Sequence, residues 1–198
     1  MPRSARIIRL VAVSAVVALA NACASTAPTP GAATPPTSPN AIHGTASSAC
    51  DPSAWRAAPV TVTHDPTVPP VPVASAIRTG AHPECRYDRI VFDITGAVPG
   101  YQAEYAQSVT TDPADRPVTV PGGGTVFLRV VLHPAQGHTD AGAPTITTRT
   151  AAVGYSMLKG YVVTGDYEGH LTVVLGLARS ALIRVGELPG RVYLDVSY

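Results

Sequence analysis

Apolar and polar residues alternate with a period of two through most of the chain after residue 70. Such alternation is typical of strands with one buried face. Segments rich in Gly and Pro interrupt it, among them GAHPEC, GAVPG, VPGGG, HPAQGHTDAGAP and LPG. Strands are predicted at residues 71–79, 87–95, 101–106, 125–133, 156–167, 169–177, 181–188 and 191–198. The pattern therefore predicts an all-β fold, a small antiparallel β-sandwich or partly open barrel.

One part of this pattern is ambiguous. The segment TTRTAAVGYSMLKG, residues 147–160, fits a short helix as well as a strand.

The first 22 residues have the layout of an export signal. Arginines lead an apolar stretch, LVAVSAVVALA, that is too short for a transmembrane helix. Ala20, Asn21 and Ala22 then form the small-x-small pattern of a signal peptidase site, and Cys23 lies where a bacterial lipoprotein carries its lipid. Ala20 departs from the lipobox pattern, which prefers Leu. We expect residues 1–22 to be a signal peptide, and we favour lipidation of Cys23 over simple secretion.

The cysteine count supports lipidation. The chain contains Cys23, Cys50 and Cys85, and an exported protein with an odd number of cysteines has one thiol left over. If Cys23 carries lipid, Cys50 and Cys85 remain to form a disulfide in an oxidising compartment. Such a bridge stabilises a fold by about 3–4 kcal/mol in the chain-entropy model.

Residues 24–49 contain no Asp, Glu, Lys or Arg and consist mainly of Pro, Ala, Ser, Thr and Gly. A segment of this composition cannot bury enough apolar surface to offset its ordering entropy. The sequence thus predicts a signal peptide at residues 1–22, a lipidated cysteine and disordered tether at 23–69 with Cys50 tied to the domain, and a β domain at 70–198. We expect the protein at the outer face of the cell membrane, held by its lipid alone, or secreted if it is not lipidated.

The formal net charge of the chain is only +1. Nucleic-acid-binding proteins usually carry a strong basic patch, so no nucleic-acid partner is predicted. No cofactor is predicted either. The glycines at 122–124 precede no lysine, and the sequence around Ser156 lacks the second glycine of a nucleophile elbow.

The strands predicted at residues 87–95 and 191–198 carry the same pattern, DRIVFDI in one and GRVYLDV in the other. Alternate side chains of a strand share a face, so Ile90, Phe92 and Ile94 should point to the core. The opposite faces form an outward row: Tyr87, Arg89, Asp93, Arg191, Tyr193 and Asp195. Antiparallel pairing would set Arg89 opposite Asp195 and Asp93 opposite Arg191, whereas parallel pairing would set like charges together. Antiparallel pairing, or placement in two sheets, is therefore expected.

Two interpretations of this outward row remain open. It is either a solvated face with weak ion pairs, or a recognition surface whose tyrosine rings and guanidinium groups bind sugars or carboxylates.

Three segments, IRTGAHPECRYDRIVFDITGAVPGYQAEY, GDYEGHLTVVLGL and RVYLDV, together resemble the AMIN-like domain of secreted proteins and lipoproteins of high-GC Gram-positive bacteria. The resemblance spans residues 78–196. It implies a β-sandwich-like domain related to the AMIN domains of cell-wall amidases and envelope secretins, which bind peptidoglycan. The family motif also contains Arg78 and His82, which join the outward row as candidate ligand-binding residues. Pro83, Glu84 and Cys85 depart from the motif, which suggests that the disulfide is a local addition.

These features predict a non-catalytic envelope lipoprotein whose β domain binds peptidoglycan or an envelope partner protein. An interaction module without glycan binding is one alternative. A cell-wall hydrolase is another, with Glu104 or Glu168 as its carboxylate and one of three histidines, His82, His133 or His138, as its base.

A metal site is the remaining alternative. It would draw on the loop HPAQGHTD, which contains His133, His138 and Asp140. Zinc sites usually have tighter or helical ligand spacing and a further ligand, so a polar loop is the favoured interpretation. The sequence predicts no metal and no catalytic residue.

Overall fold

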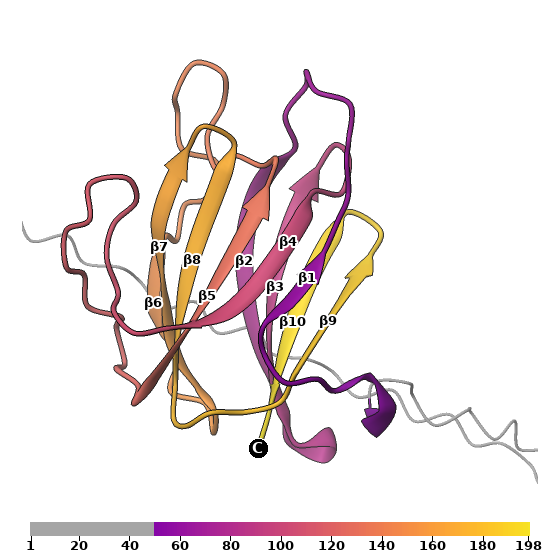
Figure 1. Ribbon diagram of the computed structural model, residues 1–198, viewed down its shortest axis with the longest axis vertical. Helices are drawn as coiled ribbons and strands as arrows, with labels where there is room; N and C mark the ends of the chain where they lie inside the picture. Colours follow the sequence, from indigo (N-terminus) through magenta and orange to yellow (C-terminus); the bar gives the residue numbers. More distant parts are fainter. Residues whose placement is uncertain (1–49) are drawn as a thin grey trace, which may run out of the picture. The chain divides into compact units, whose positions relative to one another are not determined.

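The computed structural model describes residues 50–198, which form two sheets that face each other (Figure 1). The strands are β1 (Val60–Val62), β2 (Val73–His82), β3 (Tyr87–Thr95), β4 (Gly100–Ala106), β5 (Val126–His133), β6 (Thr150–Ala152), β7 (Leu158–Tyr167), β8 (His170–Leu177), β9 (Ile183–Leu188) and β10 (Arg191–Ser197). Two short 3-10 helices, η2 (Pro52–Ala54) and η3 (Pro83–Cys85), precede β1 and β3.

The larger sheet has six strands in the order β1-β4-β5-β8-β7-β6, and the smaller has four in the order β2-β3-β10-β9. All neighbouring strands are antiparallel. The predicted all-β antiparallel sandwich is therefore confirmed, and neither sheet closes into a barrel.

The predicted strands correspond to β2–β5 and β7–β10. The sequence did not predict β1 and β6, which have three residues each. The ambiguous segment at 147–160 contains β6 and the start of β7, and it forms no helix, so the strand interpretation is correct. β1 pairs with β4 although it precedes the boundary predicted at residue 70. The predicted signal peptide, Cys23 and the tether as far as residue 49 lie outside the described residues.

The hydrophobic core fills the space between the two sheets. Ile90, Phe92 and Ile94 of β3 point into it, as their spacing predicts, and they are almost completely buried. Leu128 and Leu175 face them from β5 and β8 and are fully buried too. Burial of this apolar surface is the main force that joins the two sheets.

A charged residue, Asp88, shares this core face. Its Oδ2 accepts hydrogen bonds from the backbone N–H groups of Met157 and Leu158 at 2.6 and 2.9 Å. Asp88 is fully buried, and burial of a carboxylate is tolerated where hydrogen bonds compensate it. Asp88 therefore ties β3 in one sheet to the start of β7 in the other.

Candidate functional site

The outward row was predicted from the repeated pattern in β3 and β10, and these strands pair as expected. Arg89 lies opposite Asp195, and Asp93 lies opposite Arg191. Arg89 Nε and Nη2 donate to the two Asp195 oxygens at 2.6 and 2.9 Å. Arg191 Nε lies 3.3 Å from Asp93 Oδ1. The antiparallel pairing is confirmed.

One end of the outward row is buried, which corrects the prediction that it faces outward. Asp195 is 0% and Tyr87 is 1% exposed. Arg184 of β9 is also buried, and its Nε and Nη2 donate to Asp195 Oδ2 at 2.8 and 2.5 Å. His82 stacks on Tyr87 with ring centroids 4.5 Å apart. Asp195 is thus the centre of an internal ion cluster that contains one carboxylate and two guanidinium groups.

The segment before β1 covers this cluster. The Trp55 ring centroid lies 4.8 Å from Arg184 Cζ, and Arg56 exchanges two backbone hydrogen bonds with Ile183 at 2.8 Å. A disulfide joins Cys50 to Cys85 and so fixes the start of the segment next to η3, as the cysteine count predicts. The covered end of the row therefore belongs to the interior of the domain.

The other end of the row remains exposed. Arg78 Nε and Nη2 donate to the Asp93 carboxylate at 2.6 and 2.5 Å, and this pair holds the pKa of Asp93 below its usual 3.8. The side chains of Arg78 and Arg191 are about half exposed. Tyr193 lies across Gly186, where a Cβ atom would come within 2.4 Å of the tyrosine hydroxyl. A small, charged patch is what remains of the predicted recognition surface.

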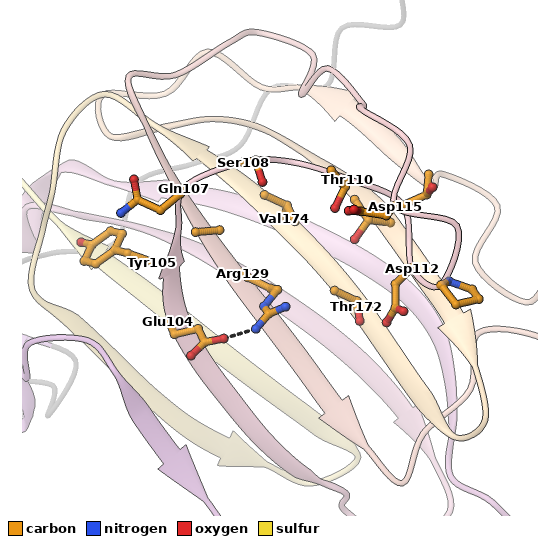
Figure 2. Close-up of a pocket in the computed structure, with 14 residues that line it drawn as sticks. Glu104, Tyr105, Gln107, Ser108, Thr110, Asp112, Asp115, Arg129, Thr172 and Val174 are labelled. Carbon is orange, nitrogen blue, oxygen red and sulfur yellow. Dashed lines mark hydrogen bonds and ion pairs between the residues drawn. The ribbon is translucent and has the colours of Figure 1, made fainter.

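A polar pocket of about 410 Å³ lies over the outer face of the six-stranded sheet (Figure 2). Residues of β4, β5, β7 and β8 line it on the sheet side, and the loop after β4 lines it on the other. The lining residues are Glu104, Tyr105, Ala106, Gln107, Ser108, Thr110, Thr111, Asp112, Pro113, Asp115, Arg129, Thr164, Thr172 and Val174. Of these residues, only Glu104 was predicted from the sequence, as a possible hydrolase carboxylate.

An ion pair occupies the strand end of the pocket. Glu104 and Arg129 lie opposite each other in β4 and β5, and the guanidinium donates to the Glu104 carboxylate. Gln102 Nε2 donates to the same carboxylate at 3.2 Å. The charges of Glu104 and Arg129 therefore offset each other.

Two aspartates occupy the loop end of the pocket. The Asp115 N–H donates to the Thr111 carbonyl at 2.7 Å, and the Asp112 N–H donates to the Thr164 carbonyl at 2.9 Å, which fixes the loop on β7. Gly165 permits this approach, because a Cβ atom there would lie only 2.9 Å from Asp112 Cβ. This turn is therefore held by backbone hydrogen bonds, and its two carboxylates stay free for other contacts.

The residues considered for a metal site are dispersed. His133 stacks on His170 at 4.0 Å, and its burial, together with the neighbouring His170, lowers its pKa below 6.5. His138 Nδ1 lies 2.9 Å from Asp166 Oδ1, whereas Asp140 accepts a hydrogen bond from a glutamine in its own loop. Among residues 50–198, no group of three His, Cys, Asp or Glu residues is placed to hold a metal ion.

The two carboxylates considered for hydrolysis are also apart. Glu104 lies within β4, whereas Glu168 lies at the exposed turn between β7 and β8. Its neighbours in that turn, Tyr167 and His170, end the β7–β8 ladder, and that turn does not line the pocket. None of the three histidines considered as a base, His82, His133 and His138, lines the pocket with Glu104.

Two antiparallel sheets that face each other define the domain as a β-sandwich, and a polar pocket lies on the outer face of its larger sheet. The chain belongs to the AMIN-like domain family, whose family model matches residues 72–198. The match includes β2 to β10 and every residue that lines the pocket. No curated protein and no solved structure matches the chain. No helix in the described part of the chain is long and apolar enough to cross a membrane.

Proposed function

We propose that this domain is a non-catalytic binding module of the cell envelope and that its ligand is peptidoglycan. Membership of the AMIN-like family supports a cell-wall-related role outside the cytoplasm. The related AMIN domains of amidases and secretins bind peptidoglycan, which suggests the class of ligand.

The polar pocket is the observation that carries this proposal. Its volume of about 410 Å³ lies within the range of roughly 300–1,000 Å³ typical of small-molecule sites. It presents carboxylates, a guanidinium, an amide and hydroxyl groups around the apolar side chain of Val174. Peptidoglycan presents hydroxyl, amide, carboxylate and amine groups, and each of these finds a hydrogen-bond partner in such a lining.

The contacts of Glu104 support binding rather than hydrolysis. A general acid must have a carboxyl free to protonate the leaving group. Both Arg129 and Gln102 donate to the Glu104 carboxylate, so it is already occupied. We therefore propose that Glu104 orients Arg129 toward the ligand.

Sedimentation of the full chain with purified peptidoglycan tests the proposal. The wild-type protein should sediment, and the double variant Glu104→Gln, Arg129→Gln should bind at least about tenfold more weakly, a difference of about 1.4 kcal/mol. The matched control is Arg78→Gln with Asp93→Asn, because it removes the two ion pairs of Asp93 from the other sheet and also leaves the net charge unchanged. The control should bind like the wild type.

Each failure has a separate meaning. If the wild-type protein stays in the supernatant, peptidoglycan is not the ligand. If the control loses binding and the pocket variant does not, the ligand binds at the exposed patch of the four-stranded sheet.

A further inference from the structure

We infer that the polar pocket binds the protonated primary amine of its ligand. This inference rests on the proposed function, because it names the chemical group that the same pocket would recognise on peptidoglycan. The two ends of the pocket differ in charge. Glu104 and Arg129 offset each other at the strand end, whereas the loop end carries Asp112 and Asp115.

The aspartates at the loop end have no partner that offsets their charge. Neither the Asp112 nor the Asp115 carboxylate has a hydrogen bond or ion pair with another described residue. Arg116 follows Asp115 in the chain, but it does not line the pocket. Two uncompensated carboxylates in a concave site attract a cation.

A buried hydroxyl group at the same pocket is a second, independent observation. Thr164 lines the same pocket and is only 6% exposed. Its Oγ1 has no hydrogen-bond partner among the described residues. Buried polar side-chain atoms nearly always have a partner, and we infer that the ligand supplies the one for Thr164.

The absence of a side chain at Gly165 lets Asp112 approach Thr172. The point where a Cβ atom of residue 165 would lie is 3.2 Å from Thr172 Oγ1 and 3.3 Å from Asp112 Oδ2. Figure 2 shows Asp112 beside Thr172, with Asp115 next to Thr110 along the same loop. The Asp112 carboxylate and the Thr172 hydroxyl therefore lie close to each other at the loop end of the pocket.

A primary ammonium group fits this arrangement better than a metal ion does. It has three N–H donors and no acceptor, and carboxylate and hydroxyl oxygens accept hydrogen bonds. Calcium needs six to eight oxygen ligands arranged around it, and among residues 50–198 no group of three His, Cys, Asp or Glu residues is placed to hold a metal ion. Peptidoglycan offers primary amines from two sources, the diamino acid of a stem peptide and a deacetylated sugar.

Acetylation of the amines in purified peptidoglycan is the first test. The full-chain protein should bind N-acetylated peptidoglycan at least about tenfold more weakly than untreated peptidoglycan. If it binds both equally, the proposed function stands and the amine inference is wrong. If it binds neither, the proposed function fails. Titration with soluble amines then tests the amine inference by itself.

Soluble probes distinguish the two sources of the amine. Amide chemical shifts of the labelled full chain are followed during titration with the tripeptide Ala-Glu-Lys, with a glucosamine trimer, with the N-acetylated form of each, and with calcium chloride. We expect the amide chemical shifts of Thr164 and Thr172 to change with one of the two free-amine probes. The N-acetylated form of that probe should leave them unchanged. Saturable binding of calcium alone, or equal binding of the acetylated probes, would overturn the inference.

Variants separate recognition from folding. The double variant Asp112→Asn, Asp115→Asn should reduce binding of the free amine about as much as acetylation of the amine does. The control is Asp65→Asn, because Asp65 is exposed and does not line the pocket. The control should bind like the wild type. Thr164→Val should weaken binding without lowering the unfolding midpoint, because the hydroxyl has no partner in the unliganded domain. Unchanged binding by both pocket variants would contradict the inference.

Discussion

Replacement of Asp195 by Asn tests whether the covered end of the outward row stabilises the fold. The amide keeps the size and shape of the carboxylate but removes its charge. Arg89 and Arg184 would then remain close together without their shared counterion. The arginines cannot turn easily to solvent, because Arg89 lies over the Tyr193 ring at 4.1 Å and Arg184 lies over Trp55 at 4.8 Å.

The expected loss of folding stability follows from the burial of these three side chains. The Asp195 side chain is 0% exposed, and those of Arg184 and Arg89 are 4% and 18% exposed. Removal of one partner from a buried ion pair usually destabilises a protein by about 3–5 kcal/mol. For a domain of this length, each kcal/mol lowers the melting temperature by roughly 2–4 °C. Asp195→Asn should therefore lower it by about 6–20 °C.

The assay is urea and thermal unfolding of the full chain, followed by circular dichroism. Asp93→Asn is the matched control, since Asp93 occupies the equivalent position in the repeated pattern and also binds two arginines. Its partners are half exposed, so solvent screens the interaction and the loss should be small. Equal losses in the two variants would refute the reasoning, because burial would then not distinguish the two ends of the row.

Two further predictions concern acid titration and the disulfide. Asp93 should titrate below pH 3.8 because Arg78 hydrogen-bonds to it. Its contribution to stability is then complete above about pH 4 and is lost as the pH falls through the folded-state pKa. In Arg78→Gln, carboxyl ¹³C NMR should show this pKa closer to 3.8, and an unchanged value would contradict the assignment. Replacement of Cys50 and Cys85 by Ser, whose bridge spans 35 residues, should lower the free energy of unfolding by about 3–4 kcal/mol. An unchanged urea midpoint would show that the bridge does not constrain the unfolded chain.

The alternating pattern identified the longer strands because each has one face in the core. β3 illustrates this, since Ile90, Phe92 and Ile94 are buried at every second position. β1 and β6 escaped detection because three residues hold too little of a period-two pattern. They join the sheet through backbone pairing with β4 and β7, which the sequence pattern does not encode.

The repeated pattern identified which residues share a face, but not what covers that face. Strand parity and charge set Arg89 opposite Asp195. The burial of Asp195 depends on Arg184, which lies opposite it in β9, and on Trp55, which comes from a distant part of the chain. A contact of that kind leaves no periodic signal.

The pocket was missed for a related reason. Its residues come from four strands and one loop, and each polar residue alone looks like an ordinary exposed position. The loop sequence TTDPAD, residues 110–115, was the available signal, since it gathers two carboxylates and two hydroxyl groups in a turn. Only the fold shows that this turn lies over Thr164 and Thr172.

The limits of the family match favour the pocket over the outward row as the site of the proposed ligand. The match begins at residue 72, so Cys50 and Trp55, which fix and cover the Asp195 cluster, precede it. With that cover in place, Tyr87 and Asp195 pack inside the domain and cannot reach a ligand without local unfolding. The pocket lies entirely within the matched residues and needs no change of fold to admit a ligand. We therefore propose that the Asp195 cluster stabilises the fold and that the pocket binds the ligand. The Asp195 variant should then lose stability, whereas the Glu104–Arg129 variant should lose binding.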